Sequence, residues 1–310
     1  MKNEELVKQL TSPSKNSRLE KFGKTITFLC LALIVFIVAM ILLFVAQKGL
    51  ATFFVNKVSL VEFLFSGDWS PSEGKFGALP MILGSFVVTL LSALVATPFA
   101  IGAAIFMTEI SPKGAKFLQP AIELLVGIPS VVYGLLGILI VNPMMYKLEL
   151  MIYHGSKTHQ FTGGANLLSA IIVLAIMILP TLINISETAL KAVPDDYRKS
   201  SLALGASKMQ TIFKVVVPSA KSGIMSAIVL GVGRAIGEAM AILLVAGNAV
   251  SLPLPFNSVR FLTTAIVSEM GYASGTHRQV LFTIGLVLFI FIMVINLVLT
   301  YVLKRGDLDE

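Results

Sequence analysis

The chain has 310 residues, of which 56% are hydrophobic and only 13% are charged. A soluble protein of this length needs more charged surface, so the composition excludes a soluble domain and predicts a protein that crosses the membrane several times. The formal net charge of +7 would suit a nucleic-acid-binding protein, but the cations separate between loops and form no single patch. We therefore expect membrane lipid and no nucleic acid around this chain.

Long apolar stretches predict an all-α membrane protein with six transmembrane helices, because a helix needs about 20 apolar residues to cross the bilayer core. These helices are expected at residues 26–46, 80–107, 117–141, 167–185, 222–245 and 280–303. Pro129 and Ser130 are candidates for a helix break inside the third span. Such a break could expose backbone groups to a substrate path, and a simple packing kink is about as good an interpretation.

Lysine and arginine predict the orientation of these spans. The tail at residues 1–24, the second-to-third loop, the fourth-to-fifth loop and the C-terminal end hold 16 of the 24 basic residues. The opposite loops hold 7, and Arg234 lies inside the fifth span. The excess predicts that both termini and the 193–218 segment are cytoplasmic. The predicted organisation is a tail (1–24), a first span with an external loop (25–79), a five-span core (80–304) and a second tail (305–310).

The 193–218 segment reads VPDDYRKSSLALGASKMQTIFKVVVP and differs from an ordinary loop. It contains good helix formers in place of turn residues, so it predicts a pair of helices. Pro194 suits the first helical position, and Gly205 permits a sharp turn between the two helices. Pro218 is expected to break the second helix. A folded helical element between two spans offers a surface to a soluble partner.

Three motifs carry a resemblance to a known family. The sequence ALGA at 203–206, followed by Pro218, resembles the EAA-type loop of ABC-transporter permeases, which docks into the ATPase subunit. The sequences GIPSVVYG at 127–134 and LGVGRAIGE at 230–238 resemble the third-span and fifth-span motifs of phosphate-uptake permeases. From about residue 80 to its C-terminus the chain resembles the PstC family of phosphate ABC transporter permeases.

This resemblance implies the type I ABC importer permease fold, in a multi-pass protein of the bacterial plasma membrane. The implied partners are a PstA-like second permease, PstB-like ATPase subunits and a PstS-like extracytoplasmic phosphate-binding protein. The residues implied in coupling to the ATPase are Lys199, Ser200, Ser201, Ala203, Gly205 and Pro218. Lys199 stands where the family has the glutamate of its EAA triplet.

The chain contains no phosphate-binding-loop motif, so we expect a transport subunit that has no ATPase site of its own. It is expected to need no cofactor or metal itself, and ATP and magnesium would bind to the partner ATPase. Two alternatives from other classes remain at this point. One is an ion-coupled secondary transporter, and the other is a membrane sensor or scaffold.

Arg234 and Glu238 are the candidates for the substrate path. They lie four residues apart, so in a continuous helix they would share one face. A charged residue at mid-bilayer costs at least about 2.5 kcal/mol and usually faces a functional cavity. The arginine fork suits an oxyanion, and Glu238 would partly neutralise it. A purely structural ion pair is the alternative. An arginine alone does not separate phosphate from sulfate or molybdate.

Overall fold

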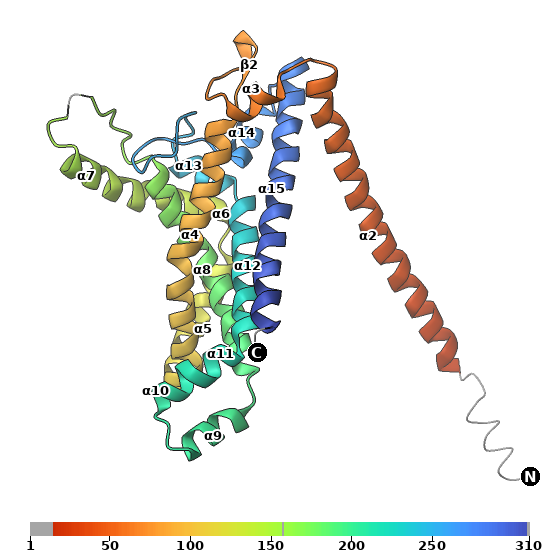
Figure 1. Ribbon diagram of the computed structural model, residues 1–310, viewed down its shortest axis with the longest axis vertical. Coiled ribbons are helices and arrows are strands. Elements are labelled where there is room, and N and C mark those ends of the chain that lie inside the picture. Colours follow the sequence, from red (N-terminus) through yellow and green to blue (C-terminus); the bar gives the residue numbers. More distant parts are fainter. Residues whose placement is uncertain (1–14, 157, 309–310) are drawn as a thin grey trace, which may run out of the picture.

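The computed structural model describes residues 15–156 and 158–308, and helices dominate it (Figure 1). Five helices of the described part are long and apolar enough to cross a membrane. A sixth span is reached if Lys208–Ser219 and Lys221–Gly237, which meet at a bend of 65°, are counted as one. The predicted all-α, multi-span architecture is therefore confirmed.

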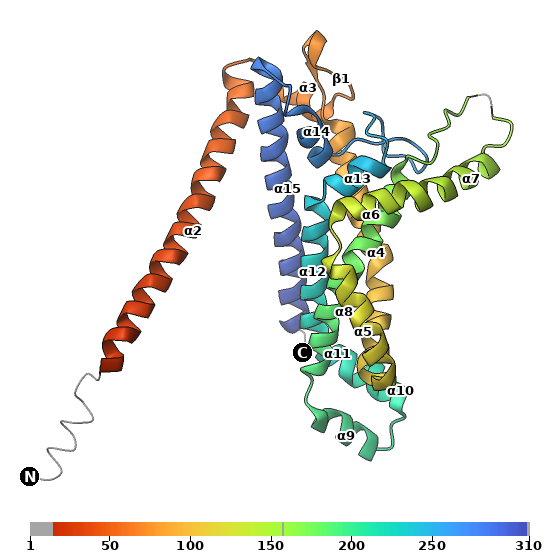
Figure 2. The ribbon, with the colours of Figure 1, turned by 180° about the vertical axis from the view of Figure 1, so that it is seen from behind.

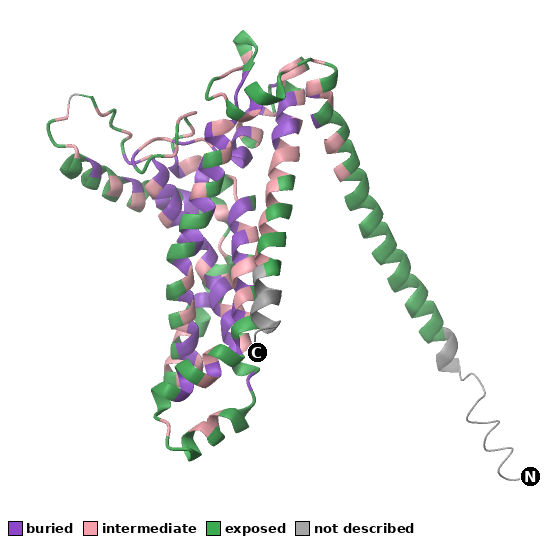
Figure 3. Cartoon of the chain, in the orientation of Figure 1, coloured by how far each residue is buried: buried purple, intermediate pink, exposed green. Residues whose placement is uncertain are grey.

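The first helix, α2 (Lys15–Phe54), leaves the bundle and contacts it only near its C-terminal end (Figure 2). There it packs on α15 (Gly275–Leu308), where Thr283 Oγ1 donates to the carbonyl of Gly49 at 2.8 Å. The predicted tail is partly wrong, because residues 15–24 continue this helix, and residues 1–14 lie outside the described residues. The apolar part of α2 is exposed along its length (Figure 3).

A small folded unit follows α2. It contains α3 (Leu60–Phe65) and a two-stranded hairpin, in which β1 (Trp69–Ser70) pairs antiparallel with β2 (Lys75–Phe76). A 3-10 turn, η1 (Pro71–Glu73), joins the strands. Apolar side chains of this unit pack with α14 (Leu262–Glu269) and α15 in a separate core, whose buried members include Phe63, Phe76, Leu262 and Leu281.

The centre of the bundle is formed by three helices, α4 (Leu79–Ile105), α8 (Leu167–Lys191) and α12 (Lys221–Gly237). α8 packs against both of the others and supplies more of the buried side chains of the largest core than any other helix. At its C-terminal end α4 passes into a π-helical turn, η2 (Phe106–Ile110). α4 and α8 each contain an internal proline, which neighbouring helices make tolerable in a spanning helix.

The third predicted span (117–141) differs from the structure. α5 (Pro112–Gly127) ends at the predicted break, and α6 (Ser130–Leu136), a π-helical turn η3 (Gly137–Val141) and α7 (Asn142–Ile152) follow it. Ile128 is extended, with ψ 125°, because a following proline disfavours the helical conformation. The long apolar unit is therefore Ser130–Ile152, and α7 projects sideways from the bundle (Figure 1).

The fifth span was predicted as one helix over 222–245, and this is wrong. α12 ends at Gly237, and a separate short helix, α13 (Met240–Val245), begins after a break at Glu238 and Ala239. Glu238 has an extended backbone, and its Oε1 accepts a hydrogen bond from the N–H of Ala241 at 2.9 Å. The carboxylate therefore caps α13 and stabilises the break. A further short helix, α14 (Leu262–Glu269), precedes α15.

The 193–218 segment contains the predicted pair of helices, α9 (Asp195–Ala203) and α10 (Lys208–Thr211). A π-helical turn, η4 (Ile212–Val216), and α11 (Val217–Ser219) lead from α10 to α12. Pro194 precedes the first helical residue, one position earlier than predicted. Pro218 does not end the second helix where predicted: the helical run continues to Ser219, and the bend follows at Ala220.

Candidate functional site

α9 and α10 form an exposed surface at one end of the bundle. α9 buries none of its residues. Leu204, directly after α9, is 89% exposed, and Leu202, Met209 and Phe213 are also largely exposed. Exposed apolar side chains in a segment that is predicted to lie outside the membrane indicate a contact surface.

The residues predicted for ATPase coupling lie on α9 and on the turn after it, except Pro218, which lies in α11. Lys199 is exposed and its Nζ is 3.8 Å from the carboxylate of Asp196. Ser201 Oγ lies 2.9 Å from Thr211 Oγ1, which joins α9 to α10. Gly205 has φ +84°, a left-handed conformation that favours glycine. Ser200, Ala203 and Pro218 are exposed.

Sequence reasoning missed the residue that fastens α9 to the bundle. Arg198 donates from Nη2 to Glu109 Oε1 at 2.6 Å and from Nε to both oxygens of that carboxylate at 3.2 Å. It also donates to the carbonyls of Leu190 and Val193, at 2.9 and 2.6 Å, at the C-terminal end of α8. Hydrogen bonds to Glu109 raise the pKa of Arg198 above its ordinary value, more than partial burial lowers it, so Arg198 stays charged.

Two helix breaks meet in the middle of the bundle. α6 packs against α13, and Gly134 allows this close approach because a Cβ there would lie 3.0 Å from the Cα of Ala241. Tyr133 Oη donates to the carbonyl of Leu125 at 2.8 Å, which connects the two sides of the first break. Thr263 Oγ1 donates to the carbonyl of Glu238 at 2.8 Å in the second. Side chains thus satisfy backbone groups that the breaks leave free.

Arg234 lies in the last turn of α12, next to the second break, and is half-buried. Its Nη1 donates to Thr181 Oγ1 of α8 at 2.7 Å. The predicted common face with Glu238 is wrong, because the helix ends between the two residues and Glu238 caps α13 instead. Within the described residues no carboxylate forms an ion pair with Arg234. A cation whose hydrogen-bond partner here is a neutral hydroxyl keeps donors for an anion.

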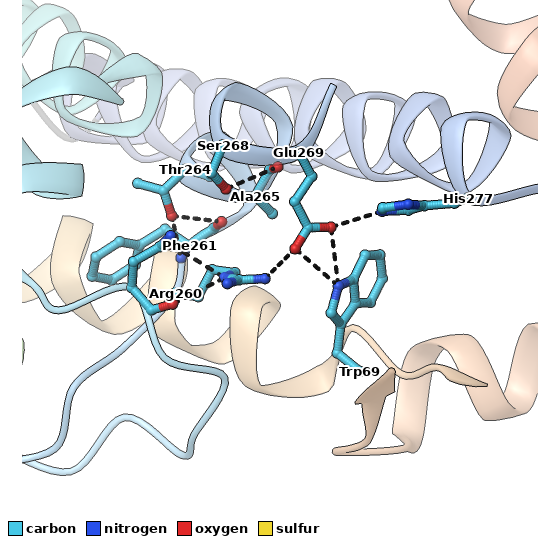
Figure 4. Close-up of polar contacts among 9 residues, drawn as sticks. Trp69, Arg260, Phe261, Thr264, Ala265, Ser268, Glu269 and His277 are labelled. Atoms are coloured by element: carbon cyan, nitrogen blue, oxygen red, sulfur yellow. Dashed lines mark hydrogen bonds and ion pairs between the residues drawn. The ribbon is translucent and has the colours of Figure 1, made fainter. Parts of the chain in front are cut away.

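A different arginine shows how the chain holds a structural cation. Arg260 pairs with Glu269 at the end of the bundle opposite α9, and both side chains are largely buried, at 17% and 7% exposed (Figure 4). Glu269 also lies 2.8 Å from His277 Nε2 and accepts from Trp69 Nε1 at 3.1 Å. The hairpin, α14 and α15 are joined through this one carboxylate. Trp69 is partly buried and packs against the core of this unit as well.

Replacing Glu269 with glutamine is expected to destabilise the protein. The change leaves Arg260 as an uncompensated, largely buried charge, which costs at most about 3–5 kcal/mol. Thermal unfolding of the purified protein in detergent measures the effect. Glu73→Gln is the matched control, because Glu73 pairs with Lys75 on the surface at 2.9 Å and such a pair contributes about 0–1 kcal/mol. An equal change in Tm for both variants would contradict the assigned role.

Comparison with known proteins agrees with this architecture. The family described as "Binding-protein-dependent transport system inner membrane component" matches residues 96–306, and the chain belongs to this family. The chain is 43% identical over 310 residues to the "Probable ABC transporter permease protein YqgH" of Bacillus subtilis, covering 98% of this chain and 97% of the relative. It is 34% identical over 260 residues to the "Phosphate transport system permease protein PstC" of Pasteurella multocida, covering 80% and 81%.

The fold also matches solved structures. A bacterial ABC transporter involved in the import of the acidic polysaccharide alginate aligns with a TM-score of 0.63 at 18% identity, covering 93% of this chain and 99% of that chain. A chain of the MetNI methionine ABC transporter aligns with a TM-score of 0.52, covering 72% and 93%. The chain is therefore an inner-membrane permease of an ABC importer with the type I fold, and the resemblance to PstC is confirmed.

Proposed function

We propose that this permease moves inorganic phosphate inward across the bacterial plasma membrane. The observation that carries the proposal is Arg234, a half-buried cation at a helix break whose side chain bonds only to Thr181 among the described residues. Two further partly buried arginines, Arg198 and Arg260, are each paired with a glutamate. Relatives named as phosphate permeases support the choice of anion.

Arg234 has the chemistry that an oxyanion path requires. A guanidinium is always charged and presents a rigid fork of donors that matches two oxygens of a phosphate group. Thr181 occupies one Nη and leaves the rest of the fork for an anion. In this proposal Glu238 and the helix break at Ile128–Ser130 shape the path. Glu238 accepts from the N–H of Ala241 and does not neutralise Arg234. Sulfate or molybdate is the alternative cargo, since the same fork would bind either.

The energy would come from ATP hydrolysed by a partner that docks on the exposed α9–α10 surface. The same importer would include a PstA-like second permease, PstB-like ATPase subunits and a PstS-like binding protein. ATP and magnesium would bind the ATPase and not this chain. An ATPase that copurifies and is required for uptake would separate this proposal from an ion-coupled transporter.

Uptake by whole cells tests the cargo. Cells that lack this chain should lose high-affinity uptake of radiolabelled phosphate and should regain it when the chain is restored from a plasmid. Sulfate uptake in the same cells should not change. Loss of sulfate or molybdate uptake with normal phosphate uptake would assign the other cargo and overturn the proposal.

The orientation is also tested directly. Both described ends, at α2 and α15, lie toward the end of the bundle that carries α9 (Figures 1 and 2). With the exposed Cys30 replaced by serine, a cysteine at His154 should react with an impermeant maleimide in intact cells. A cysteine at Lys208 should react only after the cells are opened. Labelling of both in intact cells would contradict cytoplasmic termini.

A further inference from the structure

We propose that Glu109 and Arg198 form the link through which movement of α9 reaches the transmembrane helices. The proposal rests on the proposed function, in which a partner ATPase acts on α9. Arg198 is a positioning residue in this account, since it acts through α4 and α8 and does not touch the cargo. Glu109 lies 89 positions earlier in the chain, in the π-helical turn at the end of α4.

α9 is only weakly packed on the bundle. It buries none of its own residues, although it touches η4. Among the described residues, its polar side-chain contacts to other elements are those of Arg198 and the hydroxyl pair of Ser201 and Thr211. Arg198 makes the stronger of the two, because its hydrogen bonds to a carboxylate are charge-assisted and partly buried.

Arg198 contacts two elements besides its own helix. Its guanidinium contacts the end of α4 through Glu109 and the end of α8 through the carbonyls of Leu190 and, just beyond the helix, Val193. A cation is favourable at the carbonyl end of a helix. One planar group therefore holds three elements, α4, α8 and α9, in a fixed arrangement.

Helix α8 connects this arrangement to the candidate path. α8 is one helix from Leu167 to Lys191, and Thr181 lies nine residues before Leu190, or about 14 Å along the axis. Thr181 is the residue that accepts the hydrogen bond of Arg234. A shift of α9 that carries Arg198 with it would thus displace α8 and α4 together. The contact between Ser201 and Thr211 connects α9 to a different helix, α12, by way of α10 and η4.

The experiment uses the complete importer in proteoliposomes and compares Glu109→Gln, Arg198→Lys and the exchanged pair Glu109→Arg with Arg198→Glu. Assembly, basal ATPase, ATPase stimulated by the phosphate-loaded binding protein and phosphate uptake are measured. Each single variant should assemble and keep basal ATPase within about twofold, while stimulation and uptake fall at least tenfold. The exchanged pair should regain part of both. Glu123→Gln is the matched control, because Glu123 is exposed and bonds only to Gln119 at 3.0 Å.

Two outcomes overturn the link. Wild-type stimulation in Glu109→Gln and Arg198→Lys would show that no movement passes through the pair. Failure of every variant of the pair to assemble would show a purely structural role. The proposed function is tested separately, by the wild-type importer. If this importer takes up no phosphate, the proposed cargo is wrong. Stimulation of its ATPase by the binding protein still measures the link between Glu109 and Arg198.

Discussion

Arg234→Gln is expected to lower phosphate uptake by roughly one to two orders of magnitude while the importer still assembles. The glutamine amide ends about where Nε of Arg234 lies, so the hydrogen bond from Nη1 to Thr181 Oγ1 at 2.7 Å is lost, at a cost of about 0.5–1.5 kcal/mol that should not prevent assembly. The variant loses the charge, and a hydrogen bond to a charged group contributes about 1.5–3 kcal/mol. The measurement is initial uptake of radiolabelled phosphate by purified complexes in proteoliposomes.

Arg234→Lys should recover only part of this loss, because a point charge does not reproduce the bidentate fork. Glu238→Gln is the control. Its amide oxygen can still accept from the N–H of Ala241, so the cap of α13 and the uptake should change little. Uptake that is normal in Arg234→Gln but lost in Glu238→Gln would remove Arg234 from the path. If Arg234 and Glu238 formed an ion pair instead, Arg234→Gln and Glu238→Gln would each be unstable.

Gly205→Glu is expected to leave the protein in the membrane but to separate it from its ATPase. The φ of Gly205 is +84°, which costs a residue with a side chain roughly 1–2 kcal/mol. A Cβ would meet no atom within 4 Å, so the strain comes from the backbone and not from a clash. The new carboxylate would stand beside Leu204, on the surface that the partner is proposed to cover. Uptake should fall to background.

Copurification of the ATPase with a tagged permease measures this effect. Gly205→Asn is the matched control, because asparagine tolerates a left-handed conformation and adds no charge. It should keep most of the ATPase bound. Equal amounts of ATPase on Gly205→Glu and on the wild type would mean that the partner docks elsewhere.

The sequence predicts those features of the fold that depend on local pattern. Apolar length located the first, second, fourth and sixth spans, and helix formers with a glycine predicted α9 and α10. The GIP sequence predicted the break before α6, because a proline restricts the residue in front of it. The extension of α2 back to Lys15 and the departure of α2 from the bundle were not predictable, since hydropathy does not say what a helix packs against.

The errors at the candidate site have a common cause. The spacing of Arg234 and Glu238 indicates a pair only if the helix continues, and Glu238 ends it by capping α13. Glu109 and Arg198 are far apart in the chain, so no local motif indicates that they meet. Thr181 carries no signal in the sequence beyond its hydroxyl. Contacts between distant elements need the tertiary structure.

The most direct test of the account is phosphate uptake by the purified importer, reconstituted with its second permease, ATPase and binding protein. The account predicts uptake that requires ATP inside the vesicles with the ATPase, is unaffected by collapse of the proton and sodium gradients, and persists in a tenfold excess of sulfate. Uptake that needs an ion gradient and not ATP, or that sulfate abolishes, would contradict it.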